Sequence, residues 1–169
     1  MNKVSGGSNM YPFVDFTWNP VKGACIHDCL YCYMKRFPTR PLKPLRLVEK
    51  DMKENLGEGN FIFVGSSCDM FAQNIPDEWI TKTLEYCNNF DNRYLFQSKN
   101  PARMIKYIPP MPLHTVLCTT IETNRWYPEI MGNSPKPIDR VDPIMNSLYK
   151  TFLTIEPIMD FDLVEFVEM

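Results

Sequence analysis

Five short runs of apolar and β-branched residues alternate along the chain with polar clusters. The runs lie at residues 12–18, 61–65, 93–97, 114–121 and 151–155. Each run is shorter than a typical helix and rich in residue types that favour strands, so the pattern predicts five strands. The run at 61–65 is apolar throughout, which is typical of a strand buried on both faces of a parallel sheet.

Segments with apolar residues at helical spacing separate these strands. We expect helices at 29–37, 47–56, 76–87, 102–107, 139–149 and 160–169, and irregular chain at 126–137. The segment 76–87 is the clearest, because Asp77 and Glu78 stand in its first turn, where the helix dipole favours carboxylates. Strands that alternate with helices predict βαβ units, so we expect an α/β fold with a parallel sheet.

Polar residues follow each predicted strand. Because right-handed crossovers bring the carboxyl ends of parallel strands to one edge, we expect these residues to gather at a single site. They are Ser66, Ser67 and Asp69 after the second strand, Lys99 after the third, Thr120, Glu122, Asn124 and Arg125 at the end of the fourth, and Glu156 after the fifth.

The first strand leads into a loop that contains three cysteines, Cys25, Cys29 and Cys32. Thiolates at such short spacing are typical of a soft metal centre. Iron–sulfur clusters and structural zinc sites usually take four protein ligands, so three leave one coordination position open for chemistry. The other cysteines, Cys68, Cys87 and Cys118, stand alone in apolar surroundings, and we expect them to be core residues.

Size and composition indicate one globular domain, residues 1–169. Hydrophobic residues make up 44% of the chain and charged residues 22%, which excludes a disordered protein. The net charge of −2 argues against an extended surface for non-specific phosphate binding. The polar segment 1–11 does not resemble a secretory signal and no apolar run has the length of a membrane span, so we expect a cytoplasmic protein.

The C-x3-C-x2-C motif after the first strand, with Tyr31 before its last cysteine, resembles that of the radical S-adenosylmethionine (SAM) enzymes. Further segments, 17–20, 63–66, 98–101 and 155–157, resemble a phage- and prokaryote-associated radical SAM family of unassigned function, which is distantly similar to spore photoproduct lyase. The resemblance implies a partial (βα) TIM-like barrel. About five of its six strands are seen, so we expect a C-terminally truncated chain, a naturally short one, or a partner that covers the open edge.

The resemblance also implies cofactors and roles. The three cysteines would hold a [4Fe–4S] cluster, and its free iron would bind S-adenosylmethionine. Reductive cleavage by an electron from a donor such as flavodoxin or ferredoxin would give a 5′-deoxyadenosyl radical, which abstracts hydrogen from an unknown substrate. Tyr33 would contact the adenine, Ser66, Ser67 and Asp69 the methionyl amino group, Lys99 or Arg125 the carboxylate, Thr120, Glu122 and Asn124 the ribose, and Glu156 cofactor or substrate.

Two other hypotheses compete with this one. The first is a zinc-binding structural module whose fourth ligand is His27 or Cys68; otherwise we expect His27 to be an exposed loop residue. The second is a fragment that binds a cluster without catalysis. Similarity to the photoproduct lyase group makes nucleic acid one option for the substrate. The basic connector 35–46 is either a solvated loop or an anion-facing rim near the cluster.

Overall fold

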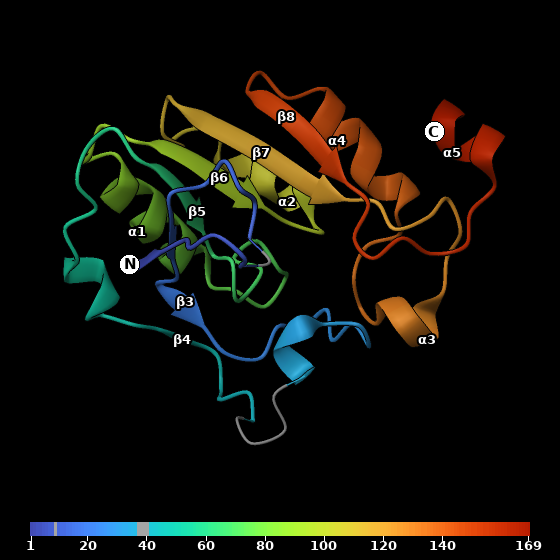
Figure 1. Cartoon of the computed structure of the whole chain (residues 1–169), viewed down its shortest axis with the longest axis horizontal. Coiled ribbons are helices and arrows are strands. Elements are labelled where there is room, and N and C mark those ends of the chain that lie inside the picture. Colours follow the sequence, from blue (N-terminus) through green and yellow to red (C-terminus); the bar gives the residue numbers. More distant parts are fainter. Residues whose placement is uncertain (9, 37–40) are drawn as a thin grey trace.

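A six-stranded sheet forms the centre of the computed structural model, which describes residues 1–8, 10–36 and 41–169 (Figure 1). The strand order is β1-β2-β5-β6-β7-β8. The strands are β1 (Asn2–Lys3), β2 (Phe16–Trp18), β5 (Phe61–Val64), β6 (Arg93–Gln97), β7 (Thr115–Thr120) and β8 (Lys150–Thr154). A separate pair consists of β3 (Val21–Lys22) and β4 (Arg46–Leu47).

Five neighbouring strands, from β2 to β8, are parallel, as the alternating pattern predicts. The sheet does not close into a barrel. The remaining strand of this sheet, β1, pairs antiparallel with β2 at one edge. The other edge is β8, in which Leu153 is exposed, as is Ile155 directly after it. A partner that covers this edge stays a prediction.

Helices cover one face of the sheet (Figure 1). They are α1 (Asp77–Cys87), α2 (Pro101–Met104) and α4 (Val141–Met145), and two more, α3 (Pro128–Met131) and α5 (Leu163–Glu168), lie beyond the end of the sheet. The main core lies under the first three, where Ile80 and Leu84 of α1 pack with Ile62, Tyr94 and Phe96 of the strands. The apolar stripe predicted for 76–87 therefore faces the sheet.

The opposite face of the sheet carries a second, aromatic cluster. Tyr11 and Phe13 stack with their ring centroids 5.3 Å apart, and both lie edge-on to Phe152 of β8. Residues 12–15, predicted as part of the first strand, instead cross this face. The chain turns there because Val14 N donates to Tyr11 O at 3.1 Å, and β2 begins only at Phe16.

The helix predicted at 47–56 is wrong. This segment contains the end of β4 and a single 3-10 turn, Asp51–Lys53, although Met52 and Leu56 are buried as the spacing indicates. The strand forms because residues 46–47 pair with β3. At 29–37 the described part contains only the 3-10 helix Tyr33–Arg36; position 37 lies outside the described residues.

Three further predictions need adjustment. The helix predicted at 102–107 is a short α2 followed by the 3-10 turn Ile105–Tyr107. The one predicted at 139–149 is the 3-10 turn Ile138–Arg140 followed by α4, and α5 is shorter than predicted. The stretch 126–137 is irregular except for α3. Throughout the described residues, no helix combines the length and apolar character needed to cross a bilayer.

Candidate functional site

The cysteine loop, residues 24–33, leaves the β3–β4 pair at Gly23. This glycine has φ +130°, and a Cβ placed on it would lie 2.6 Å from Leu45 Cα, so only glycine fits. Ala24 N then donates to Lys43 O at 3.0 Å, which fixes the start of the loop beside residues 43–45.

The loop directs alternate residues inward and outward. Cys25 is half-buried, and His27 and Cys29 are buried, whereas Ile26 and Leu30 between and beyond them are exposed. The loop therefore turns the side chains of His27 and Cys29 toward the protein and those of Ile26 and Leu30 toward solvent.

Residues 130–133, at the end of α3, hold this loop in place. Leu30 N donates to Ile130 O at 2.8 Å, and Asn133 N donates to His27 O at 2.7 Å. Gly132 lies between them at φ +61° and ψ −133°, where a Cβ would overlap the carbonyl oxygen of His27. Cys29 also reaches this segment, since its thiol donates to the Met131 carbonyl oxygen at 3.3 Å. The segment predicted to be irregular thus shapes the cysteine loop.

His27 is 4% exposed, so its prediction as an exposed loop residue is wrong. The clamp from residues 130–133 turns it inward, where its Nε2 lies 2.9 Å from Oδ2 of Asp69. Burial alone would lower the pKa of His27, but the bond to Asp69 and the charge of Asp69 raise it. Its Nδ1 is buried without a hydrogen-bond partner.

Asp69 connects the loop after β5 to the end of β6. Besides His27, its Oδ2 accepts hydrogen bonds from Ser98 Oγ at 3.0 Å and Lys99 N at 2.9 Å, and its Oδ1 accepts one from Phe71 N at 3.0 Å. Burial would raise the pKa of this carboxyl, but the bonds and charge of His27 and the bonds from Lys99 and Ser98 lower it. Asp69 is therefore an ionised carboxylate that organises the strand ends.

A charged network joins the cysteine loop to β6 and β7. Glu122 Oε1 accepts hydrogen bonds from Tyr31 OH and from Lys99 Nζ, and Lys99 Nζ also donates to Tyr31 OH at 2.7 Å. On its other oxygen, Glu122 pairs with Arg140 Nη1 at 2.8 Å. Burial would raise the pKa of Glu122, but the charges of Lys99 and Arg140 and the hydrogen bonds from Lys99 and Tyr31 lower it.

Arg140 is a member of this network that sequence reasoning missed. Its side chain is 0% exposed, and besides Glu122 it donates to the carbonyl oxygens of Thr120 and Pro135 and to Ser134 Oγ at 3.1 Å. It lies in the predicted helix 139–149, where an arginine normally indicates a solvated surface. Its role becomes evident only from its contact with Glu122 in the folded chain.

Asn19 is a second missed residue. It stands directly after β2, and its Oδ1 accepts hydrogen bonds from Ser67 N at 2.8 Å and Ser67 Oγ at 3.0 Å, while its Nδ2 donates to Ser66 Oγ at 3.1 Å. Tyr33 OH donates to Ser66 O at 2.7 Å. Tyr33, Ser66 and Ser67 therefore lie together. Asn19 could have been predicted to join them, because it directly follows a predicted strand.

Four predicted residues lie apart from the cysteines. Thr120 Oγ1 accepts from Gln97 Nε2 at 2.9 Å and contacts Thr154 Oγ1 at 3.1 Å, across neighbouring strands. Asn124 and Arg125 hold the C-terminal segment instead: Asn124 Nδ2 donates to Glu165 at 2.9 Å, and Arg125 pairs with Asp160. Glu156 is exposed beyond the end of β8.

The three cysteine thiols have a donor chemistry that suits a cluster. Contact with the Cys68 thiol, then burial, raises the pKa of Cys25, and burial raises the pKa of Cys29, so both must lose a proton to bind metal. In the described part of the chain, no three His, Cys, Asp or Glu side chains gather closely enough to hold one metal ion. A four-iron cluster does not require this, because each thiolate binds a different iron atom.

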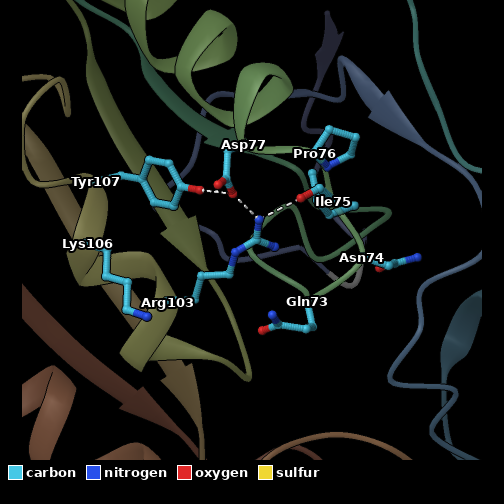
Figure 2. Close-up of a pocket in the computed structure, with 8 residues that line it drawn as sticks. All are labelled: Gln73, Asn74, Ile75, Pro76, Asp77, Arg103, Lys106 and Tyr107. Atoms are coloured by element: carbon cyan, nitrogen blue, oxygen red, sulfur yellow. Dashed lines mark hydrogen bonds and ion pairs between the residues drawn. The ribbon is translucent and has the colours of Figure 1, made fainter.

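A separate open pocket of about 490 Å³ lies between the segment before α1 and the residues of α2 and the turn after it (Figure 2). Arg103 donates to the carbonyl oxygens of Ala72 and Ile75 and pairs with Asp77, which also accepts a hydrogen bond from Tyr107 OH at 2.5 Å. The polar groups of Arg103, Asp77 and Tyr107 therefore already have hydrogen-bond partners within the protein. None of the predicted site residues lines this pocket.

Comparison with known proteins identifies a family and a fold. The family described as "Protein of unknown function (DUF5131)" matches residues 9–166. A solved structure, "Spore photoproduct lyase complexed with dinucleoside spore photoproduct", is similar with a TM-score of 0.66 and 16% sequence identity, over 90% of this chain and 48% of that one. No curated protein matches. At this identity the likeness shows the fold alone, and the chain spans about half the length of the lyase.

Proposed function

This chain belongs to the DUF5131 family of proteins of unknown function, and from its own site we propose that it is a radical SAM enzyme with a [4Fe–4S] cluster held by Cys25, Cys29 and Cys32. One observation carries the proposal. The cysteine loop contacts the carboxyl ends of β5, β6 and β7 through His27–Asp69 and through Tyr31 with Lys99 and Glu122. Cysteines and groups of both charges thus share one edge of the parallel sheet.

The cofactors would supply the difficult step. Held by Cys25, Cys29 and Cys32, a cluster would supply the single electron needed for reductive cleavage of S-adenosylmethionine. The protein supplies binding, orientation and exclusion of water.

Strand-end side chains would bind the zwitterionic part of S-adenosylmethionine. The Lys99 side chain is 18% exposed at the rim of the charged network, and its ammonium offers a cation for the methionyl carboxylate. Ser66, Ser67 and Asp69 offer acceptors for the amino group. Asp69 already accepts four hydrogen bonds, so we assign it mainly to holding His27 and Lys99. Tyr33, next to Ser66, would contact the adenine.

Most of the remaining strand-end residues already have partners within the chain. Glu122 lies beside Lys99, but its side chain is buried and both oxygens are bonded, so it would have to release Tyr31 or Lys99 to accept from the ribose. The Thr120 hydroxyl is bonded to Gln97 on the neighbouring strand. Asn124 and Arg125 would have to leave Glu165 and Asp160 to reach a cofactor, and Glu156 would meet substrate rather than cofactor. For the substrate we propose a nucleic acid, since the lyase of similar fold is described in complex with a dinucleoside.

Anaerobic reconstitution with iron and sulfide tests the proposal. We expect a brown protein with about four irons per chain, which cleaves S-adenosylmethionine to 5′-deoxyadenosine when dithionite is added. Cys25→Ala, Cys29→Ala and Cys32→Ala should each lose the cluster. Cys87→Ala is the matched control, because Cys87 is the last residue of α1 and is fully buried in the core.

Two outcomes would replace the proposal. A colourless chain that retains only zinc would favour a structural module, with His27, or Cys68, whose thiol contacts that of Cys25, as the fourth ligand. A cluster that forms without any cleavage of S-adenosylmethionine would indicate a chain that binds iron and does not catalyse. Iron and zinc analysis together with the 5′-deoxyadenosine assay separate these cases.

A further inference from the structure

The proposed function leaves one buried thiol beside the cysteine loop unexplained. Cys68 lies in the turn after β5, its side chain is 4% exposed, and its thiol contacts that of Cys25. Both are free thiols in this structure. Cys25, Cys29 and Cys32 already supply the three thiolates of the proposed cluster, so the position of a fourth thiol against one of them needs another reason.

The strands that lead into the two thiols are neighbours in the sheet. β2 pairs in parallel with β5, so that Trp18 lies opposite Val64, and Gly65 N donates to Trp18 O at 2.9 Å. The turn that carries the buried thiol begins directly after Val64, and the chain that leads through β3 to the cysteine loop begins directly after Trp18. The register of the sheet therefore fixes where the two loops start relative to each other.

Side-chain bonds then hold the two loops together on either side of Cys68. Before it, Ser67 N and Ser67 Oγ donate to Asn19 Oδ1 at 2.8 and 3.0 Å. After it, Asp69 Oδ2 lies 2.9 Å from Nε2 of His27, which belongs to the cysteine loop. Cys68 is thus held against the cysteine loop from both sides, without help from a metal.

The spacing of the cysteines alone would favour a different pair. Cys29 and Cys32 form a C-x2-C motif, which closes a disulfide in many redox proteins. The fold engages the Cys29 thiol elsewhere, because it donates to the Met131 carbonyl oxygen at 3.3 Å. The structure therefore favours Cys25 and Cys68 over the pair that the spacing suggests.

We propose that Cys25 and Cys68 form a reversible disulfide in the metal-free chain, with a peroxide as the oxidant. The Cys25 thiolate attacks one peroxide oxygen, the O–O bond breaks, and Cys25 becomes a sulfenic acid while the other oxygen leaves as water. The Cys68 thiolate then attacks the Cys25 sulfur, which forms the S–S bond and releases a second water. The two thiols lose two electrons in total, and one hydrogen peroxide is reduced to two molecules of water.

The exposure of the two thiols sets the order of these steps. Cys25 is partly exposed and can be reached by a small oxidant from solvent, whereas Cys68 is buried. A sulfenic acid without a neighbouring thiol is oxidised further to a sulfinic acid, which dithiols do not reduce. Cys68 therefore traps the sulfenic acid of Cys25 in a form that a thiol reductant restores.

The disulfide and a bound metal exclude each other. A sulfur in a disulfide is not a thiolate and cannot bind iron, so the linked chain should take up no cluster until it is reduced. This consequence rests on the proposed function, because it matters only if Cys25 is a cluster ligand. The disulfide itself requires only the two thiols.

Thiol mapping of the metal-free chain tests the disulfide directly. The reduced chain is treated with a chelator and then with hydrogen peroxide, unfolded, alkylated and digested with trypsin. We expect the six free thiols to decrease by two, and residues 23–35 to be released joined to residues 54–82, with the link assigned to Cys25 and Cys68 by tandem mass spectrometry. Six thiols that persist, or a Cys29–Cys32 link in place of this one, would overturn the proposal.

Cys68→Ala distinguishes a protective disulfide from a thiol that only fills space. Before oxidation this variant should load iron like the wild type. After peroxide and then dithiothreitol, the wild type should load iron as before, whereas Cys68→Ala should lose most of its loading and carry a sulfinic acid at Cys25. Cys87→Ala makes the same change at another buried thiol and should behave like the wild type.

Three results of the variant experiment would refute the proposal. One is equal recovery of iron loading by all three proteins. Another is a Cys25 that stops at the sulfenic acid in Cys68→Ala. The third is a folded Cys68→Ala chain that loads no iron before oxidation, since Cys68 would then be a ligand. The thiol map of the wild type does not depend on any variant, so it decides the case if Cys68→Ala fails to fold.

The failure of this inference and that of the proposed function are distinguishable. A Cys25–Cys68 disulfide in a chain that does not cleave S-adenosylmethionine after reconstitution would support the disulfide and refute the enzyme. Cleavage by a chain whose thiols peroxide does not link would do the reverse.

Discussion

Glu122 and Arg140 form an ion pair in which neither side chain has exposed surface, with Glu122 Oε2 2.8 Å from Arg140 Nη1. The removal of one partner leaves the other charge buried, which typically costs about 3–5 kcal/mol. We therefore expect Arg140→Met to lower the free energy of unfolding by about that amount, as measured by urea denaturation. Lys82→Met, at the exposed Lys82–Glu49 pair, is the control and should cost less than about 1 kcal/mol. An Arg140→Met chain as stable as the control would contradict this account.

The same carboxylate should make stability depend on acid. Burial raises the pKa of Glu122, but Lys99 and Arg140 outweigh it, so the pKa in the folded chain lies below the ordinary value. The ionised carboxylate therefore stabilises the fold above the unfolded pKa of about 4.3, and this contribution is lost as the pH falls through the lower folded value. Glu122→Gln cannot ionise, so its melting temperature should differ most from the wild type near neutral pH and approach it in acid. A constant difference at every pH would argue against the ionised form.

Gly132→Ala should disturb the cysteine loop. At φ +61° and ψ −133° an alanine is strained by about 1–3 kcal/mol, and its Cβ would also overlap the His27 carbonyl oxygen. We expect a lower melting temperature and less iron bound after reconstitution. Gly59→Ala is the matched control, since Gly59 also has positive φ, at +71°, and a Cβ there meets nothing within 4 Å. Full iron loading of Gly132→Ala would show that residues 130–133 do not shape the site.

Asp69→Asn should loosen the contact between the cysteine loop and the strand ends. Oδ2 of Asp69 accepts from His27, Ser98 and Lys99, and an amide nitrogen at that position cannot accept from them. The loss should be about 1–3 kcal/mol, since buried donors lose their acceptor. Chemical denaturation measures it, and the exposed Asp91→Asn should have almost no effect. A similarly small effect for both variants would show that Asp69 does not hold the cysteine loop against the strand ends.

The elements predicted correctly from the sequence are those whose apolar pattern lies entirely within the element itself. β5, β6, β7 and β8 each coincide with an apolar run, and α1 has both a clear apolar stripe and acidic residues at its start. The segment 47–56 misled the prediction because Met52 and Leu56 reach the core from an irregular chain. The spacing of apolar residues correctly indicates that Met52 and Leu56 are buried. It does not show that the backbone between them is irregular and not helical.

The site was predicted in part for the same reason. Strand ends locate Asp69, Lys99 and Glu122 without any knowledge of distant contacts. The burial of His27 depends on Asn133 and Gly132, and the pairing of Glu122 depends on Arg140, all far away in sequence. Such contacts leave no periodic signal, so an inward histidine looks like a loop residue and a buried arginine like a surface one.

The clamp on the cysteine loop also has a consequence for biosynthesis. The loop lies within the first fifth of the chain, whereas the backbone groups that hold it, at Ile130 and Asn133, are synthesised about a hundred residues later. While the ribosome is still translating the sheet, the cysteine loop lacks the backbone groups that hold it. We expect iron and sulfide to be inserted after release, into a chain that has already folded, and a cell extract should load the completed protein more readily than ribosome-bound chains that stop before α3.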